Sequence, residues 1–122
     1  MAPDPNVVPK AGPRPRVAVV SLHTSPLDQP GTGDSGGMNV YVRAAAERLA
    51  RRGVDVDVFT RRRSRDVAEV EELSPGSQIV HVTAGPIEPL PKEELGRYLP
   101  EFVDGMLHRA GASGYDLVHT HY

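Results

Sequence analysis

The chain has 122 residues, of which 12 are glycine and 12 are proline, and its 14 basic and 16 acidic side chains give a formal net charge of −2. This composition is typical of a soluble chain with one domain at most. The sequence has no apolar run of about 18 residues, no signal-peptide core and no cysteine, which excludes a membrane span, disulfides and thiolate zinc sites. Because nucleic-acid binders usually carry a net basic face, the near-neutral charge argues against a nucleic-acid partner. We expect a cytoplasmic protein.

The beginning of the chain predicts a disordered leader followed by a buried strand. Prolines are concentrated in residues 1–15, and proline lacks the N–H group that a sheet requires, so we assign the leader to 1–15. The run 16–22 is nearly all apolar and rich in β-branched residues, as expected for a strand buried on both faces. Residues 23–36 then form a connection rich in proline and glycine. It is longer than the ~2–6 residues usual in α/β units, which indicates a functional loop.

Three further elements are expected in the middle of the chain. A helix is predicted from Met38 to Arg52, because apolar residues recur at helical spacing and Gly53 stands where a helix commonly ends. Strands are predicted over 54–60 and 78–83. The charged excursion between them, 61–76, carries a basic cluster flanked by acidic residues, which we interpret as a solvated loop. This cluster consists of Arg61, Arg62, Arg63 and Arg65.

The last part of the chain predicts one more helix and a final strand. Residues 91–94 suit a helix start, and apolar residues recur at helical spacing as far as Leu107, although Pro100 should kink or split this helix. A strand is predicted over 115–122. The order strand, helix, strand, strand, helix, strand predicts an α/β fold with a partial Rossmann-like, doubly wound parallel sheet. Because nothing follows the last strand to cover it, we expect residues 16–122 to be an incomplete domain.

The glycine-rich loop is the first candidate for chemistry. Residues 31–36 match G-x-G-x-x-G, but in the dinucleotide fingerprint the first glycine follows the strand directly, which is not the case here. A broader interpretation is that Gly36 and Gly37 open a helix whose N–H groups and positive dipole end face a phosphate. The alternative is that Asp34 or Ser35 only caps the helix. The length of the loop favours a function.

Histidines at the expected carboxyl ends of strands are the second candidate. His23 follows the first strand and is expected to donate to a sugar or phosphate oxygen. His119 and His121 lie two apart on the last strand and so point to one face; packing against neighbouring loops is as good an interpretation for them as ligand contact. No carboxylate or thiolate nearby completes a metal shell, so we expect no metal site. His81 and His108 are interpreted as structural.

Lys92 is the third candidate, because it stands at an expected helix start. The helix dipole there favours anions, so a cation at this position suits a ligand that carries negative charge. The alternative is an exposed lysine paired with Glu93 or Glu94.

Two blocks of sequence carry a family resemblance. The segments SLHTSP at 21–26 and QPGTGDSGGMNVY at 29–41 resemble the amino-terminal part of the D-inositol-3-phosphate glycosyltransferases of mycothiol biosynthesis, which are retaining enzymes of the GT-B fold. The similarity continues through 84–86, 91–95 and 116–122. A shorter form of the second block recurs in sucrose-phosphate synthase-like enzymes and mannosyltransferases, which remain an alternative. A non-catalytic, flavodoxin-like module that binds phosphate or nucleotide is an alternative of another class.

The resemblance implies transfer of N-acetylglucosamine from UDP-N-acetylglucosamine to 1D-myo-inositol 3-phosphate, so that the expected partners are small-molecule substrates, an inositol phosphate and a nucleotide sugar. It implies that the amino-terminal domain holds the acceptor, whereas the carboxy-terminal domain, absent from this chain, holds most of the nucleotide sugar. We therefore expect no transfer by this chain alone. The resemblance leaves open a homodimer and a divalent metal, implies no cofactor in this chain, and assigns no catalytic residue. The acceptor contacts that it implies are His23, Asp34, Ser35, Gly36, Gly37, Met38, Asn39, Lys92 and Tyr122, and the donor contacts are Gln29, Pro30 and Gly37.

Overall fold

The computed structural model describes residues 14–23 and 37–121. Residues 1–13 of the expected leader and most of the glycine-rich loop lie outside this part of the chain. Eight elements follow one another along it. They are β1 (Arg16–Ser21), α1 (Gly37–Arg51), β2 (Asp55–Arg61), β3 (Val70–Ser74), β4 (Ser77–Val82), the 3₁₀ helix η1 (Lys92–Tyr98), α2 (Leu99–Ala110) and β5 (Leu117–His121).

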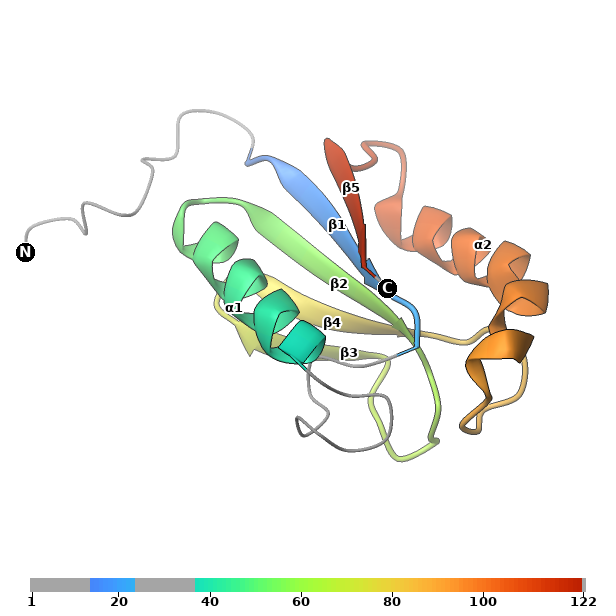
Figure 1. Ribbon diagram of the computed structural model, residues 1–122. Coiled ribbons are helices and arrows are strands. Elements are labelled where there is room, and N and C mark those ends of the chain that lie inside the picture. The colour runs from blue at the N-terminus through green and yellow to red at the C-terminus, as the bar shows by residue number, and fades with distance from the viewer. Residues whose placement is uncertain (1–13, 24–36, 122) are drawn as a thin grey trace, which may run out of the picture.

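The five strands form one sheet in the order β3-β4-β2-β1-β5 (Figure 1). All neighbouring pairs are parallel except β3 and β4, which are antiparallel. The chain steps from β1 to β2 and β4 on one side of β1, and then crosses to β5 on the other side. The prediction of a Rossmann-like parallel sheet is therefore confirmed. The reversal between β1 and β5 is a topological switch point, the place where open α/β sheets bind their ligands beyond the carboxyl ends of the strands.

The sheet separates two hydrophobic cores, one under each long helix (Figure 1). On one face, Val42 and Ala46 of α1 pack on valines of β1 and β2 and on Ile79 of β4. On the other face, Phe102 of α2 packs with Phe59 of β2 and with β4. Because both faces are covered, every residue of β2 after Asp55 is buried. The charged residues Asp57 and Arg61 of β2 therefore lie in the interior instead of facing water.

The middle of the chain confirms the predicted helix and corrects the predicted loop. The helix expected from Met38 to Arg52 is α1, and Gly53 follows it with a φ of 87°, a conformation that glycine adopts without strain. The excursion 61–76 is not a loop throughout, because Val70–Ser74 forms β3 against β4. The interpretation of the arginine cluster as solvated is wrong for Arg61, which ends β2 and is only 2% exposed.

Pro100 splits the second helical region, as expected. A 3₁₀ helix precedes it, and α2 begins at Leu99 with Pro100 in its first turn, where a missing N–H group breaks no helical hydrogen bond. Only part of the apolar pattern of this region faces the core. Phe102 is buried, whereas Val103 is 46% and Leu107 is 64% exposed.

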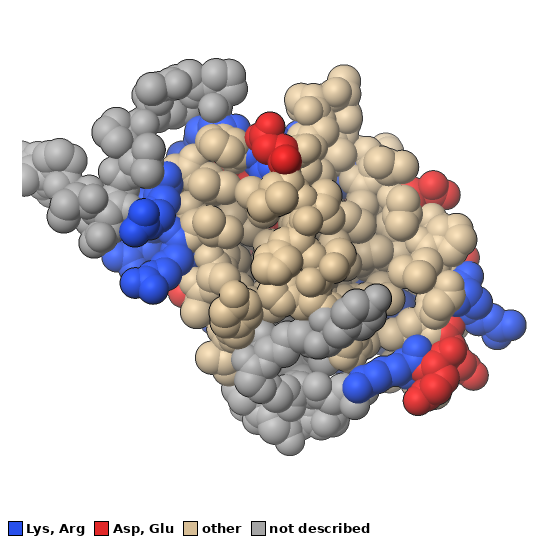
Figure 2. Space-filling view, turned by 45° about the horizontal axis from the view of Figure 1, so that its top comes forward, with Lys and Arg blue, Asp and Glu red and all other residues tan. Residues whose placement is uncertain are grey.

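The edge strand β5 is the least covered part of the sheet. It pairs with β1 alone, and its apolar residues Leu117 and Val118 are 59% and 52% exposed. On the face shown in Figure 2, charged side chains lie near the margins, and a broad uncharged area separates them. Within the described residues, no helix has the length and apolarity needed to cross a membrane.

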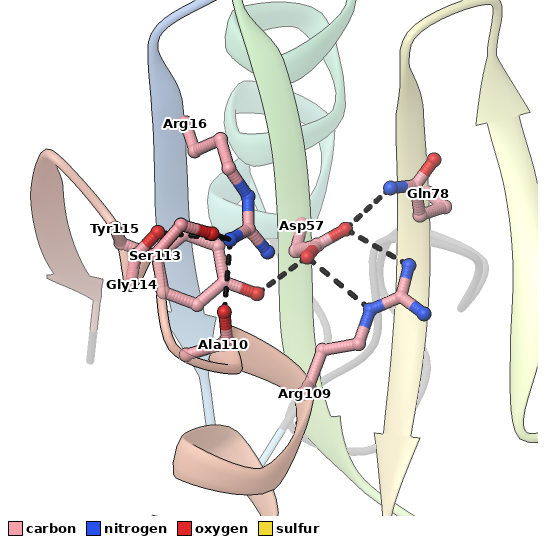
Figure 3. Close-up of polar contacts among 8 residues, drawn as sticks. All are labelled: Arg16, Asp57, Gln78, Arg109, Ala110, Ser113, Gly114 and Tyr115. Atoms are coloured by element: carbon pink, nitrogen blue, oxygen red, sulfur yellow. Dashed lines mark hydrogen bonds and ion pairs between the residues drawn. The ribbon is translucent and has the colours of Figure 1, made fainter.

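A buried carboxylate joins several elements on the face of the sheet that α2 covers (Figure 3). Asp57 of β2 is 4% exposed and accepts hydrogen bonds from Gln78 of β4, from the Tyr115 hydroxyl and from Arg109 Nε of α2, the last at 3.3 Å. Burial and the hydrogen bond to Asp57 raise the pKa of Tyr115, so that its hydroxyl stays a donor. One carboxylate thus joins two strands, a helix and the segment that leads into β5.

Arg16 holds the same segment from the side of β1 (Figure 3). Its guanidinium lies 4.6 Å from the centre of the Tyr115 ring, and its Nη1 donates to the carbonyl oxygens of Ala110 and Gly114, both at 2.9 Å. Its backbone N–H donates to the Asp116 carboxylate at 2.8 Å. The turn between α2 and β5 is therefore held by directed polar contacts as well as by apolar packing.

The two aspartates of β2 provide a matched test of this arrangement. We expect Asp57→Ala to lower the free energy of unfolding by about 3 kcal/mol, because it leaves the half-buried donors Gln78 and Tyr115 without an acceptor. Asp55 forms a partly exposed ion pair with Arg14 at 2.9 Å, so Asp55→Ala should cost less than about 1 kcal/mol. Urea unfolding of both variants measures the difference. Equal losses would show that the Asp57 network does not stabilise the fold.

Candidate functional site

The candidate site is the carboxyl edge of the sheet around the switch point. His23 follows β1, and His121 ends the neighbouring strand β5, so the two histidines come from the two strands between which the winding reverses. α1 begins after the loop that follows β1 and points its amino-terminal end to the same edge of the sheet (Figure 1). The fold therefore brings three separately predicted segments to one edge.

The beginning of α1 is suited to an anion. Gly37 is its first residue, and its first turn contains no acidic side chain. The first N–H groups of a helix have no partner within the helix, and they combine with the dipole to attract negative charge. Gly37, Met38 and Asn39, three of the expected acceptor contacts, belong to this first turn.

The two histidines of β5 point to one face, as expected from their spacing. Their ring centres lie 4.3 Å apart, and the ring of His121 meets that of Tyr41 in α1 edge to face at 5.7 Å. Burial, with a smaller contribution from His119, lowers the pKa of His121 and favours its neutral form. The described contacts thus support the packing interpretation for His121.

Arg61 joins the ends of three strands at this edge. Its backbone N–H donates to the carbonyl of Leu22 at 3.3 Å, directly before His23. Its guanidinium donates to carbonyls of the segment that follows β4: Nε to Ala84 at 2.8 Å, Nη1 to Glu88 at 2.9 Å, and Nη2 to Pro86. Burial lowers the pKa of this guanidinium, but an arginine remains protonated. The buried, charged guanidinium of Arg61 therefore holds the segment that leads to Lys92.

Sequence reasoning missed Arg61, although a signal for it was present. In a strand, residues two apart share a face, and Arg61 follows the aromatic core residue Phe59 by two positions. The neighbouring Arg62 and Arg63 made the whole cluster look like a solvated run. The guanidinium of Arg62 contacts the residues that follow it in sequence, where it donates to the carbonyl of Val67 at 2.9 Å.

Gly85 makes the segment after β4 possible. Its φ is 71°, and a Cβ at this position would lie 2.7 Å from Cδ1 of Tyr98, closer than a real Cβ approaches any atom. Its N–H donates to the Glu101 carboxylate of α2 at 3.1 Å. Glycine is thus required both for the backbone conformation and for contact with the aromatic ring.

Lys92 is exposed and opens η1, so the expected α-helical start is corrected to a 3₁₀ turn. Pro91 precedes it in an extended conformation, and Glu93 and Glu94 fill the first turn. The two glutamates suit a helix start, because the helix dipole favours negative charge there, and the positive charge of Lys92 does not. Lys92 follows the segment that Arg61 holds. Both interpretations of Lys92, contact with a ligand or pairing with Glu93 or Glu94, stay open.

The described residues include His23, Gly37, Met38, Asn39 and Lys92 from the expected contacts. The remaining ones lie outside the described residues: Gln29, Pro30, Asp34, Ser35, Gly36 and Tyr122. Among the residues that the structure does describe, no group of three or more histidine, aspartate or glutamate side chains could hold a metal ion.

A cavity of about 540 Å³ lies apart from these residues, between α2 and the β3-β4 edge. Two of the polar side chains on its wall, His81 and Arg109, are hydrogen-bonded within the protein. His81 Nδ1 bonds to the carbonyl of Ala68 at 2.8 Å, and Arg109 bonds to Asp57. This supports the interpretation of His81 as structural.

Comparisons with known proteins point to one family. The model of Glycosyltransferase Family 4 matches residues 35–122. The chain is 60% identical over 111 residues to the D-inositol 3-phosphate glycosyltransferase of Nocardiopsis dassonvillei, and 56% identical over 110 residues to that of Thermomonospora curvata. Each match covers 88% of this chain and 26% of the relative. The chain thus spans about a quarter of the length of these relatives.

A solved structure extends the comparison to the fold. The sucrose-phosphate synthase of Thermosynechococcus elongatus matches with a TM-score of 0.85 and 38% sequence identity, over 89% of this chain and 27% of that chain. The described sheet therefore corresponds to the amino-terminal, Rossmann-like part of a GT-B glycosyltransferase.

The close approach of Gly85 to Tyr98 can be tested directly. Gly85→Ala should lower the free energy of unfolding by about 2–4 kcal/mol, because it adds both backbone strain and a clash. Among the described residues, a methyl group on Gly96 in η1 would meet no neighbouring segment within 4 Å, so Gly96→Ala is the control and should shift stability by about 0.5 kcal/mol or less. Urea midpoints measure both changes. If the two variants unfold at the same midpoint, the tight packing at Gly85 is contradicted.

Proposed function

Because the chain belongs to Glycosyltransferase Family 4, we propose that it is the acceptor-binding part of a retaining transferase that moves N-acetylglucosamine from UDP-N-acetylglucosamine to 1D-myo-inositol 3-phosphate. The observation that carries this proposal is the identity of 50–60% to relatives named D-inositol 3-phosphate glycosyltransferase. This identity extends over 88% of the chain. The family model matches residues 35–122, which include the beginning of α1 and Lys92.

The geometry of the edge supports an acceptor that carries a phosphate. The first turn of α1 offers backbone N–H groups and the positive end of a 15-residue helix without an acidic side chain to compete. Lys92 adds an ammonium group at the end of the segment that Arg61 holds. Together they provide directed donors and a compact positive charge, which is what a phosphate monoester needs.

The remaining contacts in the proposal concern the sugar-like ring and the donor. We propose that His23 directs a ring N–H to a hydroxyl or phosphate oxygen of the acceptor, together with Asp34, Ser35, Gly36, Gly37, Met38, Asn39 and Tyr122. We propose that Gln29, Pro30 and Gly37 meet the donor. Since negative charge develops on the departing diphosphate, the positive end of α1 would also stabilise the transition state.

A second candidate is a transferase related to sucrose-phosphate synthase. Structural likeness at a TM-score of 0.85 favours it, but the identity of 38% is lower than the 60% found with the Nocardiopsis relative. Identity of the acceptor separates the two, since only the first candidate requires inositol phosphate.

Lys92 tests the phosphate site. Titration calorimetry of the purified chain with 1D-myo-inositol 3-phosphate should show affinity at least about tenfold lower for Lys92→Ala than for the parent, since a hydrogen bond to a charged group contributes about 1.5–3 kcal/mol. Arg97→Ala is the matched control, because it removes another cation from the same 3₁₀ helix. The guanidinium of Arg97 lies 5.9 Å from the centre of the Tyr98 ring. Unphosphorylated myo-inositol should not distinguish the variants. Equal heats for Lys92→Ala and the parent would remove Lys92 from the site.

We also expect the 122-residue chain to bind acceptor without transferring sugar. It spans 26% of the length of the relative from Nocardiopsis. The donor contacts proposed for it are Gln29, Pro30 and Gly37 alone. The assay mixes the purified chain with UDP-N-acetylglucosamine and 1D-myo-inositol 3-phosphate and measures released UDP. No release above a protein-free blank is expected. Sustained release by the parent chain, lost in Lys92→Ala, would refute this expectation.

A further inference from the structure

We propose that Arg61 is the positioning residue of the acceptor site, because it ties the segment carrying His23 to the segment carrying Lys92. The inference rests on the proposed function, in which both residues contact the acceptor. Arg61 need not contact the acceptor itself, since its hydrogen bonds are made to the backbone of these two segments.

The first contact is between backbones. The N–H of Arg61 donates to the carbonyl of Leu22 at 3.3 Å. Leu22 lies just after β1 and directly before His23, so this bond extends the contact between β1 and β2 two residues beyond the last paired residues, Val20 and Phe59. It holds the chain at the point where His23 leaves the sheet.

The second set of contacts uses the side chain. Three nitrogens of the guanidinium each donate to a different carbonyl of residues 84–88: Ala84, Pro86 and Glu88. The segment has no regular secondary structure of its own, so these bonds supply the order that a helix or sheet would supply elsewhere. It leads to Pro91 and Lys92, where η1 begins.

The burial of Arg61 makes this role specific for arginine. The residue is 2% exposed, and taking a charged side chain out of water is costly unless its donors are satisfied. A planar fork meets three carbonyls in fixed directions, whereas an ammonium group is a single centre on a flexible stem. Lysine at position 61 would keep the charge and lose the simultaneous hold on Ala84, Pro86 and Glu88.

This difference separates positioning from electrostatic attraction. If the charge of Arg61 alone attracts the acceptor phosphate, Arg61→Lys will bind as well as the parent and only Arg61→Met will bind weakly. If the fork positions Lys92, Arg61→Lys and Arg61→Met will both bind weakly. Arg62→Lys is the matched control, because the side-chain bonds of Arg62 return to residues 64–67 and do not reach the segment before Lys92.

The experiment measures binding of 1D-myo-inositol 3-phosphate to the purified chain by calorimetry, below the temperature at which any variant unfolds. We expect about tenfold weaker binding for Arg61→Lys and unchanged binding for Arg62→Lys. In the Lys92→Ala background, Arg61→Lys should cause no further loss, since the two residues act through one contact. Hydrogen exchange should show faster exchange of the amides of residues 84–94 in Arg61→Lys without ligand.

The outcomes separate this inference from the proposed function. Full affinity in Arg61→Lys, or a loss that adds fully to that of Lys92→Ala, overturns the positioning role while leaving the phosphate site intact. Unchanged exchange at residues 84–94 overturns it as well. Absence of binding by the parent chain, with faster exchange in Arg61→Lys, overturns the proposed function and with it the role of Arg61 in binding.

Discussion

Two buried charges on one strand organise this structure. Asp57 and Arg61 both point from β2 toward α2, on either side of the core residue Phe59. Neither charge reaches water, so each must gather hydrogen-bond partners from the elements around it. Asp57 gathers side chains of β4, α2 and the turn before β5, whereas Arg61 gathers backbone carbonyls at the carboxyl edge. The first charge holds the crossover that reverses the winding, and the second fixes the segments at the carboxyl edge beside the reversal.

This division explains how a structural core and a binding edge coexist in a small sheet. The apolar contacts of β2 are non-directional and would tolerate small shifts of α2 or of the segment after β4. The polar contacts are directional, and they fix the turn between α2 and β5 as well as residues 84–88. Gly85 completes the arrangement, because only glycine fits between this segment and the ring of Tyr98. The path of the chain between β4 and η1 thus depends on Arg61 and Gly85.

The chain belongs to Glycosyltransferase Family 4. In the proposed function, the helix start without acidic residues and the exposed Lys92 would bind the phosphate of the acceptor. The sequence predicted the helix α1 and its end well, because an apolar periodicity and a glycine after the last turn are local signatures. It failed for Arg61, since the neighbouring Arg62 and Arg63 concealed its burial, and for β3, whose glutamates Glu71 and Glu72 look like part of a solvated run.

The sequence by itself determined the α/β class, the helix α1 and its end at Gly53, the break at Pro100 and the resemblance of its motif blocks to a glycosyltransferase family, because each of these depends on residues close together in the chain. Tertiary structure alone decided that β2 is covered on both faces, that Asp57 and Arg61 are buried, and that β5 lies at an edge. These outcomes depend on which elements pack against which face. That is a property of contacts between residues far apart in sequence, such as Arg16 with Gly114 or Asp57 with Tyr115, and a period-2 pattern cannot reveal it.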